Sequence, residues 1–273
     1  MARQRLGQHF LADLGWREEI ARAIRVSEQS ITPIPRGEAA DFCWIEIGAG
    51  HGEMTEQLAS TGVPVHAIEL DAQLAASLKG LAKRFPNLEI LSVDVLKTDI
   101  SKIASGRRAR IYGNLPYYIT SPILHHLFAS AEIIDEIHIV IQHEVALRLV
   151  AQPGTRDYGY LSVLTQYYSR PELVLEIPPD AFRPPPEVGS ALVTLRFPGT
   201  RAKLPGLDES RFLDFVKVGF SQKRKTLVNN LKSRVEPELV RQALAKLTLR
   251  VDARTEQLSV SELAALFQVL LPA

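Results

Sequence analysis

The sequence predicts an α/β domain built on a mostly parallel sheet, followed by a small all-helical domain. Short apolar runs alternate with helical patterns between residues 43 and 195. Two prolines and two glycines then interrupt every period over 198–207, and only helical patterns follow. We therefore expect one domain over residues 1–200 and a second over residues 201–273.

The expected strands of the first domain are short and rich in β-branched residues. They read CWIEI (43–47), PVHAIEL (64–70), LEILSV (88–93), ARIYG (109–113) and IDEIHIVIQ (134–142). Helical segments such as DAQLAASLKGLAKRF (71–85) separate them, which favours parallel pairing. The segments ELVLEI (172–177) and SALVTLRF (190–197) are expected to close the sheet as an antiparallel pair.

The second domain is expected to hold helices near 208–220, 222–233, 236–247 and 259–270, where apolar residues stand three and four apart. Residues 201–234 carry nine Lys or Arg against three acids, although the whole chain has a net charge of only +1. This local excess indicates a polyanionic partner, and a solvated helix face is the alternative. The basic residues are Arg201, Lys203, Arg211, Lys217, Lys223, Arg224, Lys225, Lys232 and Arg234.

A glycine loop directly follows the first expected strand. In IEIGAGHGEM, glycines stand at positions 48, 50 and 52, where glycine allows a tight turn and a close approach to a ligand. A dinucleotide loop would need its third glycine at position 53, which is Glu53, and a glutamate there would repel a pyrophosphate. The loop therefore favours a ligand without phosphates, with NAD as the alternative.

Two carboxylates stand near the ends of the next two strands. Glu69 could accept hydrogen bonds from both ribose hydroxyls of a nucleoside, and Asp94 could accept from the exocyclic amine of an adenine. Together with Gly48 and Gly50, these acids fit S-adenosylmethionine better than NAD. The alternative is that both acids are solvated strand ends.

The fourth strand ends in Asn-Leu-Pro-Tyr, and its proline cannot donate to a sheet ladder. The Asn114 side-chain oxygen and the Leu115 carbonyl could accept from the two N–H groups of a nucleobase amine. The amine lone pair would then turn toward the methyl group of S-adenosylmethionine. Pro116 would fix the loop, and Tyr117 would offer a face for stacking the base. Taken alone, the tetrapeptide is better explained as a turn with a packed tyrosine, but its place at the end of a fourth strand behind the glycine loop favours the site.

These motifs resemble those of the small-subunit ribosomal RNA adenine dimethyltransferase family nearly from end to end. The resemblance implies a Rossmann-like class I methyltransferase domain with a seven-stranded, mostly parallel sheet, plus a helical domain that binds rRNA. It implies transfer of methyl groups from S-adenosylmethionine to N6 of two adjacent adenines, in a hairpin loop near the 3′ end of 16S rRNA. It also implies a role in small-subunit biogenesis. The matching stretches are GQHFL (7–11), EIGAGHGEMT (46–55), IELD (68–71), VDVL (93–96), NLPYYI (114–119), FRPPPEVGSALVTL (182–195) and FSQKRKTLVNNL (220–231).

The same resemblance assigns roles to individual positions. Phe182 is expected to sandwich the target base opposite Tyr117. His9 stands where the family often has asparagine, so its contact is expected to depend on pH. The S-adenosylmethionine contacts are expected at His9, Leu11, Gly48, Glu69, Asp94 and Asn114.

The segment FSQKRKTLVNNL is expected to be a helix with two faces. Lys223, Arg224 and Lys225 would meet RNA phosphates, while Leu227 and Leu231 dock on the domain.

Two alternatives stay open. The related erythromycin-resistance methylases modify one adenine of large-subunit rRNA. Their corner more often reads Asn-Ile-Pro-Tyr, so Leu115 and the basic segment favour the small-subunit enzyme. The other alternative is a non-catalytic rRNA-binding assembly factor or transcription factor, which would have no need of the glycine loop, Glu69, Asp94 and Asn114.

The remaining sequence features concern disulfides, membrane spans, metal sites and binding partners. Cys43 is the only cysteine, which excludes disulfides within the chain and indicates a reducing cytoplasm. An uninterrupted run of about 18 apolar residues is missing, so no membrane span is expected. His125, His126 and His138 lack a third ligand at matching spacing, so no metal site is expected. We expect a monomer whose partner is 16S rRNA within an immature small ribosomal subunit.

Overall fold

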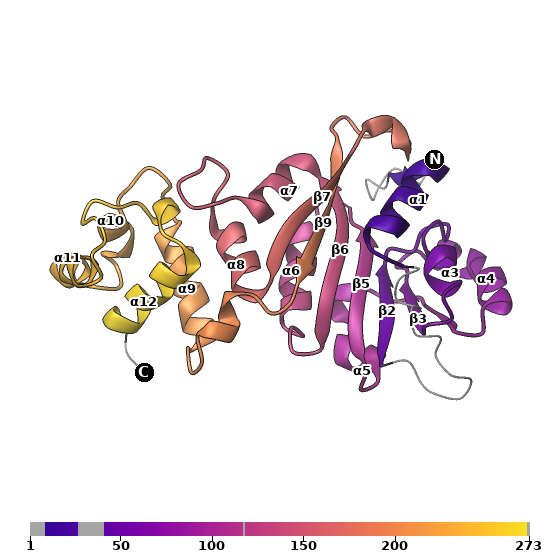
Figure 1. Cartoon of the computed structure of the whole chain (residues 1–273), viewed down its shortest axis with the longest axis horizontal. Helices are drawn as coiled ribbons and strands as arrows, with labels where there is room; N and C mark the ends of the chain where they lie inside the picture. Colours follow the sequence, from indigo (N-terminus) through magenta and orange to yellow (C-terminus); the bar gives the residue numbers. More distant parts are fainter. Residues whose placement is uncertain (1–8, 27–40, 117, 272–273) are drawn as a thin grey trace. The chain divides into compact units, whose positions relative to one another are not determined.

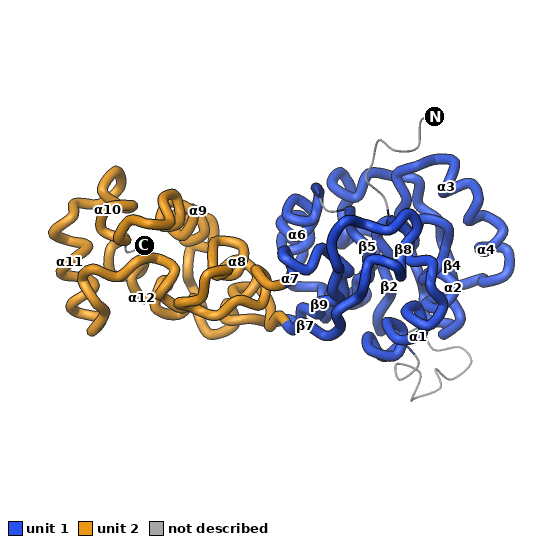
Figure 2. Tube along the Cα trace, turned by 90° about the horizontal axis from the view of Figure 1, so that it is seen from above, with its two compact units in different colours: residues 1–146, 172–197 blue, residues 147–171, 198–273 orange. Residues whose placement is uncertain are grey.

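The computed structural model describes residues 9–26, 41–116 and 118–271, and the chain divides into two compact units (Figure 2). Unit 1 comprises Met1–Ala146 and Glu172–Phe197, and unit 2 comprises Leu147–Pro171 and Pro198–Ala273. The chain leaves unit 1 close to the expected boundary at 200. The expectation fails for Leu147–Pro171, which belongs to the second unit instead of the first.

Aromatic packing explains why this segment belongs to unit 2. Helix α8 (Tyr160–Tyr168) places the ring of Tyr167 at 5.3 Å from that of Phe212, measured between centroids, and Phe212 lies in the helical core. The hydroxyl of Tyr168 donates to Glu209 Oε1 at 2.5 Å. Sequence periodicity could not reveal these contacts, because they join residues about forty positions apart.

A seven-stranded sheet forms the centre of unit 1, in the order β4-β3-β2-β5-β6-β9-β7 (Figure 1). Strands β2 to β6 pair in parallel, and β9 runs antiparallel to β6. The expected mostly parallel sheet is therefore confirmed. Its strands are β2 (Phe42–Ile47), β3 (Val65–Ile68), β4 (Leu88–Leu91), β5 (Arg108–Asn114), β6 (Ile134–Gln142), β7 (Arg170–Ile177) and β9 (Ser190–Arg196).

The strand order reverses at β2, because β3 lies on one side of it and β5 on the other. In sheets of this kind, the crevice beyond the carboxyl ends of the strands at the reversal is where ligands bind. Here that crevice lies beyond Ile47 of β2 and Asn114 of β5, whose carboxyl ends are neighbours through the register pair Ile47–Gly113.

The helices of unit 1 separate its parallel strands along the chain. The expected helix over 71–85 is divided at Leu78, close to Gly80, which is a weak helix former. The helices are α1 (Leu14–Ala23), α2 (Thr55–Ala59), α3 (Ala72–Ser77), α4 (Lys79–Arg84), α5 (Ile100–Ala104), α6 (Thr120–Phe128) and the start of α7 (His143–Val150), with short 3₁₀ turns η3 (Val95–Lys97) and η4 (Pro179–Ala181).

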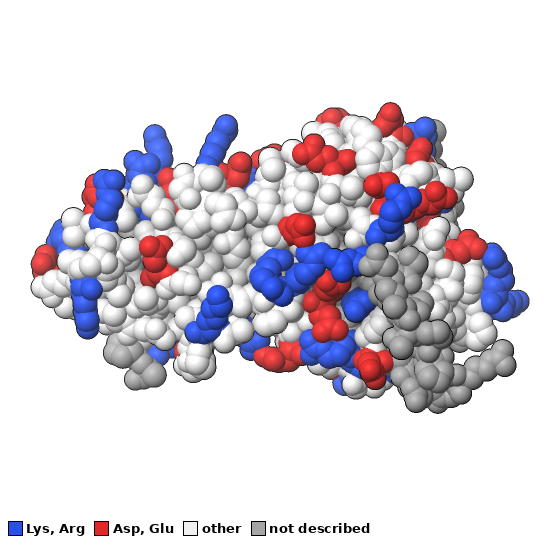
Figure 3. Space-filling model, viewed as in Figure 1, with Lys and Arg blue, Asp and Glu red and all other residues white. Residues whose placement is uncertain are grey.

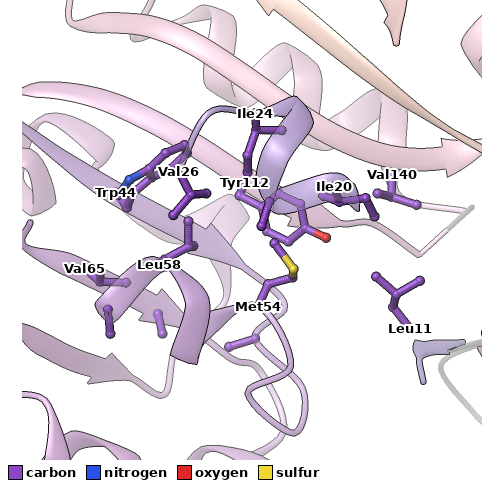
Figure 4. Packing of buried hydrophobic residues seen from close by; sticks show 14 of the residues in the cluster. Leu11, Ile20, Ile24, Val26, Trp44, Met54, Leu58, Val65, Tyr112 and Val140 are labelled. Carbon is purple, nitrogen blue, oxygen red and sulfur yellow. The ribbon is translucent and has the colours of Figure 1, made fainter. Parts of the chain in front are cut away.

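Helix α1 packs on one face of the sheet. Its Ile20 and Ile24 lie next to Tyr112 of β5, in a buried cluster that also holds Trp44 of β2 (Figure 4). The side chain of Asp13 accepts from Trp16 N at 2.9 Å and caps the helix. This packing holds the segment before α1 in place, and that segment contributes His9 and Phe10 to the candidate site.

A second, two-stranded sheet joins distant parts of the chain. Strand β1 (Phe10–Leu11) pairs antiparallel with β8 (Phe182–Arg183), so that Leu11 lies opposite Phe182. The motifs GQHFL and FRPPP therefore meet at one place.

Unit 2 is helical, as expected. Phe212, Phe215 and Phe267 pack together in its core, at ring distances of 5.7 and 5.6 Å from Phe267. No helix among the described residues of the chain has the length and apolarity to cross a membrane. Besides α8, the elements of unit 2 are η5 (Thr200–Lys203), α9 (Glu209–Gly219), α10 (Leu227–Leu231), α11 (Pro237–Lys246), η6 (Thr255–Gln257) and α12 (Val260–Leu270).

Candidate active site

The glycine loop after β2 has backbone angles that side chains rarely adopt. Gly50 has a φ of +58° and Gly52 a φ of +88°. A Cβ on Gly50 would lie 3.0 Å from the ring of Phe10, so strand β1 lies directly against the loop. Glycine is therefore required at position 50 both for its conformation and for space.

Glu69 lies at the base of this loop, just beyond β3, and is buried. Its Oε2 accepts from Gly50 N at 2.8 Å, and its Oε1 accepts from Asp71 N at 2.9 Å. A carboxylate oxygen has a second lone pair, so both oxygens can still accept from a ligand hydroxyl. The same side chain thus holds the glycine loop in shape, and its contact with a ligand ribose stays a prediction.

Asp94 lies three residues beyond the end of β4. Its Oδ1 accepts from Leu96 N at 3.1 Å and caps η3, while its Oδ2 lies 3.9 Å from Lys97 Nζ. The side chain is therefore fixed at the same edge of the sheet as Glu69. Its contact with an adenine amine stays a prediction.

A third acid, Glu46 of β2, is buried beneath the loop with 2% of its surface exposed. Burial raises the pKa of its carboxyl to about 8, which the Thr55 hydroxyl partly offsets and the charges of Glu53 and Glu69 reinforce. Glu46 Oε2 and the hydroxyl of Tyr112 are buried without a hydrogen bond to any residue that the structure describes. Such buried polar atoms at a ligand crevice are uncommon and call for an explanation.

Asn114 ends β5, and its side chain has a defined orientation. The amide Nδ2 donates to the backbone carbonyl of His9 at 2.9 Å. A carbonyl can only accept, so the amino group must face His9 and the oxygen Oδ1 must take the other side. The side chain is thus oriented by a partner 105 positions away, and the contact of Oδ1 with a nucleobase amine stays a prediction.

His9 is fixed in turn by the segment after β8. Its ring Nδ1 lies 2.8 Å from the carbonyl of Pro184, so Nδ1 carries the proton that this carbonyl accepts. The sequence places His9 among the cofactor contacts. The structure adds that its main chain orients Asn114.

The rest of the corner is built by turn hydrogen bonds. Leu115 is buried and its N–H donates to Val140 O at 3.0 Å, while the Pro116 carbonyl accepts from Ile119 N at 3.1 Å. Pro116 follows the end of β5 and precedes α6, which begins at Thr120, and its role in fixing the loop stays a prediction. Tyr117 lies outside the described residues. The acceptor role of the Leu115 carbonyl stays a prediction.

Phe182 is fully buried, with 0% of its surface exposed, in the cluster that includes Leu11, Val140 and Leu192. A base can stack only on a ring face that it can reach, so stacking on Phe182 would require the surrounding residues to move. Its role as a stacking residue stays a prediction. Leu11 is likewise buried, and its carbonyl accepts from Arg17 Nε at 2.7 Å.

The basic residues of FSQKRKTLVNNL are exposed but do not lie on a helix. The Thr226 side chain caps α10, which begins at Leu227, so Lys223, Arg224 and Lys225 form the preceding turn. The expected helix over 222–233 is therefore wrong in its first half. Lys223 Nζ donates to the carbonyl of Arg156.

Some of the basic residues in 201–234 form ion pairs with nearby acids, which reduces the positive charge that is free to meet a partner. Arg201 pairs with Glu209 at 2.8 Å, and Arg234 pairs with Asp214 at 3.0 Å. Figure 3 shows other Lys and Arg side chains standing out from the surface of unit 2.

The crevice fits S-adenosylmethionine by its charge. Glu53 and Glu69 lie close enough to raise the pKa of Glu46, so the surroundings of the loop are acidic. An acidic loop repels phosphates and attracts a cation, and S-adenosylmethionine carries a sulfonium and an ammonium group. Gly50, Glu69, Asp94 and Asn114 would hold it. Among the described residues, no group of three potential metal ligands gathers anywhere.

Comparisons with known proteins agree with this geometry. The family model described as "Ribosomal RNA adenine dimethylase" matches residues 1–271. Ribosomal RNA small subunit methyltransferase A of Koribacter versatilis (strain Ellin345) is 37% identical over 279 residues, covering 97% of this chain and 93% of its own. The protein of the same name from Xanthomonas campestris pv. campestris (strain B100) is 39% identical over 268 residues, covering 98% and 96%.

Two solved structures share the fold over nearly the whole chain. A dimethyladenosine transferase from Plasmodium falciparum has a TM-score of 0.77 at 23% identity, covering 95% of this chain and 96% of its own. The 23S rRNA methyltransferase ErmE has a TM-score of 0.70 at 26% identity, covering 96% and 99%. The class I methyltransferase fold is thus shown for the chain.

Proposed function

The chain belongs to the ribosomal RNA adenine dimethylase family, and we propose that it methylates N6 of two adjacent adenines in a hairpin loop near the 3′ end of 16S rRNA. Each adenine receives two methyl groups from S-adenosylmethionine. The observation that carries this proposal is the orientation of Asn114, whose amide oxygen is held as an acceptor at the carboxyl end of β5.

The chemistry requires positioning more than acid–base catalysis. S-adenosylmethionine supplies an electrophilic methyl group on a positively charged sulfur. The exocyclic amine of adenine is a poor nucleophile, because its lone pair is delocalised into the ring. Asn114 Oδ1 and the Leu115 carbonyl accept from its two N–H groups and turn the lone pair out of conjugation.

No strong base is needed at the site. The methylated nitrogen becomes acidic and loses its proton to water. After the first transfer only one N–H remains, so only one of the two acceptors keeps a partner. The second transfer to the same base therefore depends on the acceptor that still holds the remaining N–H group. Of the two acceptors, only Asn114 is a side chain, so only its contribution can be tested by substitution.

RNA reaches the site from an unpaired loop. Extrusion of a base costs least where the base is already unstacked, and this agrees with a hairpin loop as the target. The exposed turn of Lys223, Arg224 and Lys225 would contact the RNA backbone. We propose that the protein acts as a monomer in the cytoplasm, on 16S rRNA within an immature small subunit.

Methylation of large-subunit rRNA is the second candidate, because ErmE shares the fold and 26% of aligned residues. The small-subunit assignment is favoured by the curated relatives, which are 37–39% identical and are named small subunit methyltransferases. Incubation with each unmethylated ribosomal subunit and tritiated S-adenosylmethionine separates the two candidates. Transfer to the large subunit alone would reject the proposal.

Asn114→Ala tests the mechanism in the same assay. We expect methyl transfer to fall by at least about a hundred-fold, because a preorganised hydrogen-bond partner of the reacting group is lost. S-adenosylmethionine binding, measured by calorimetry, should remain detectable, since Glu69 and the glycine loop are unchanged. Near-normal turnover would refute the role of Asn114, and loss of both activities with a lowered melting temperature would indicate misfolding instead.

A further inference from the structure

An open pocket of about 420 Å³ lies in unit 1, beside the carboxyl ends of β6 and β7. Its volume falls in the range of ~300–1,000 Å³ that is typical of sites for small ligands. The residues assigned above to the reaction do not line it. The pocket is lined by His143, Glu176, Ile177, Pro178, Gly189 and Ser190.

The sheet register places this pocket near Asn114. Asn114 lies opposite Val140 of β6, and Gln142, two residues further along β6, lies opposite Ser190 of β9. Residues opposite one another, and residues two apart on a strand, share one face of a sheet. Ser190 is therefore on the face of Asn114, two strands away, and strand spacing puts it at roughly 10–12 Å.

The polar lining of the pocket suits a nucleobase amine. His143 Nε2 is buried and lies 3.4 Å from Glu176 Oε1, yet it makes no hydrogen bond within the described part of the chain. The side chain of Glu176 is 72% exposed, so its carboxylate can accept from an incoming N–H group. A carboxylate at the mouth disfavours a phosphate.

The apolar lining suits the flat face of a base. Pro178 is exposed and offers an apolar surface to the pocket, whereas Ile177 is buried behind it. His143 is held at the start of α7 because its N–H donates to Gly189 O at 3.0 Å. Single-stranded RNA is recognised by stacking of a base on an aromatic ring, histidine included, and by hydrogen bonds to a base edge, and His143 is the aromatic residue of this lining.

We propose that this pocket receives the base of a nucleotide flanking the adenine under methylation, and that it prefers a base with an exocyclic amine over uracil. The distance from Asn114 to the pocket matches the spacing of neighbouring nucleotides in an unstacked RNA strand. The carboxylate of Glu176 supplies the preference, because it can accept from an exocyclic amine, which uracil lacks. This inference rests on the proposed function, because it takes rRNA as the substrate.

The test uses unmethylated small subunits that carry either the natural base or uracil at each position next to the target adenine. We expect uracil at one flank to raise the KM of the wild-type protein for subunits about ten-fold, the value of one hydrogen bond to a charged group. Glu176→Gln and His143→Ala should raise KM on natural subunits by a similar factor, and they should respond to uracil less than two-fold. Calorimetry should give an unchanged affinity for S-adenosylmethionine.

Glu187→Gln is the matched control, since Glu187 is exposed in the segment between β8 and β9 that carries Gly189 but does not line the pocket. This variant should discriminate against uracil as the wild type does. The inference is overturned if the wild type does not discriminate, or if Glu176→Gln and His143→Ala discriminate as strongly as the wild type. Failure of the wild type to methylate any small-subunit adenine would reject the proposed function itself, which is a distinguishable result.

Discussion

Asn114 depends on a single main-chain carbonyl for its orientation. The NLPY motif shows from sequence that an amide stands at the end of β5, but not which of its two ends faces the crevice. The carbonyl of His9 decides this, because it binds the amino group at 2.9 Å. At the scale of single residues, the sequence therefore points to Asn114 as the candidate side chain, and the fold fixes the direction of its amide.

Glu46 has an effect on stability that follows from its burial. Its pKa is raised to about 8, whereas the unfolded chain has the ordinary value near 4.3. Between these values the folded protein binds the proton and the unfolded chain does not. The free energy of unfolding should therefore fall as the pH rises from about 4.5 to 8, by an amount on the order of a few kcal/mol.

Glu46→Gln should remove most of this pH dependence and stabilise the protein at pH 8. Urea unfolding without S-adenosylmethionine, at pH 5, 6.5 and 8, measures the effect. Glu18→Gln is the control and should change the dependence little, because Glu18 is exposed and its charge is not among those that act on Glu46. Equal pH profiles for the wild type and Glu46→Gln would show that Glu46 ionises as freely in the folded protein as in the unfolded chain.

Phe182→Ala tests the burial of the β8 ring. A fully buried phenylalanine that is cut to alanine leaves a cavity, so unfolding should become easier by about 3–5 kcal/mol. Tyr118→Ala serves as the comparison, because Tyr118 is an aromatic of the same unit that is 63% exposed. The comparison variant should lose less than about 1 kcal/mol. Similar small losses for both variants would mean that Phe182 is free to stack, as the family resemblance implies.

The pairing of β1 with β8 was beyond reach of the sequence. Each strand has two residues, which is too short for any alternation to be visible. The longer strands were predictable, because β2, β5 and β6 are apolar runs that end at turn residues. The length of α10 was mispredicted, since apolar spacing at Leu227 and Leu231 says nothing of the cap at Thr226.

The turn before α10 makes its own prediction. Arg224→Glu with Lys225→Glu should weaken RNA binding and flatten the plot of log affinity against log salt, by roughly 0.7 for each lost phosphate contact on single-stranded RNA. Lys223 is left unchanged, because it also donates to Arg156 O. The matched variant Lys79→Glu with Lys83→Glu changes the same charge on exposed residues of unit 1 and should alter the slope less. An equal slope in the two double variants would discard the turn as the RNA contact.

At the scale of the whole molecule, the sequence anticipated two bodies and misassigned one segment. The linker over 198–207 marks where the chain leaves unit 1 for the last time. Residues 147–171 were not assigned to the second unit from the sequence, because Tyr167 packs on Phe212 of α9 and a local sequence pattern does not predict such a distant contact. The residues of the candidate crevice could be picked out from the sequence because they stand at strand ends. The pocket could not, because its lining comes from three separate stretches of the chain, at His143, at 176–178 and at 189–190.

Mass spectrometry of rRNA from cells lacking this protein tests the central claim most directly. We expect two adjacent unmethylated adenines near the 3′ end of 16S rRNA. Wild-type protein should restore four methyl groups on N6, and Asn114→Ala expressed at the same level should restore none. Full dimethylation in the deletion strain, or restoration by Asn114→Ala, would contradict the account.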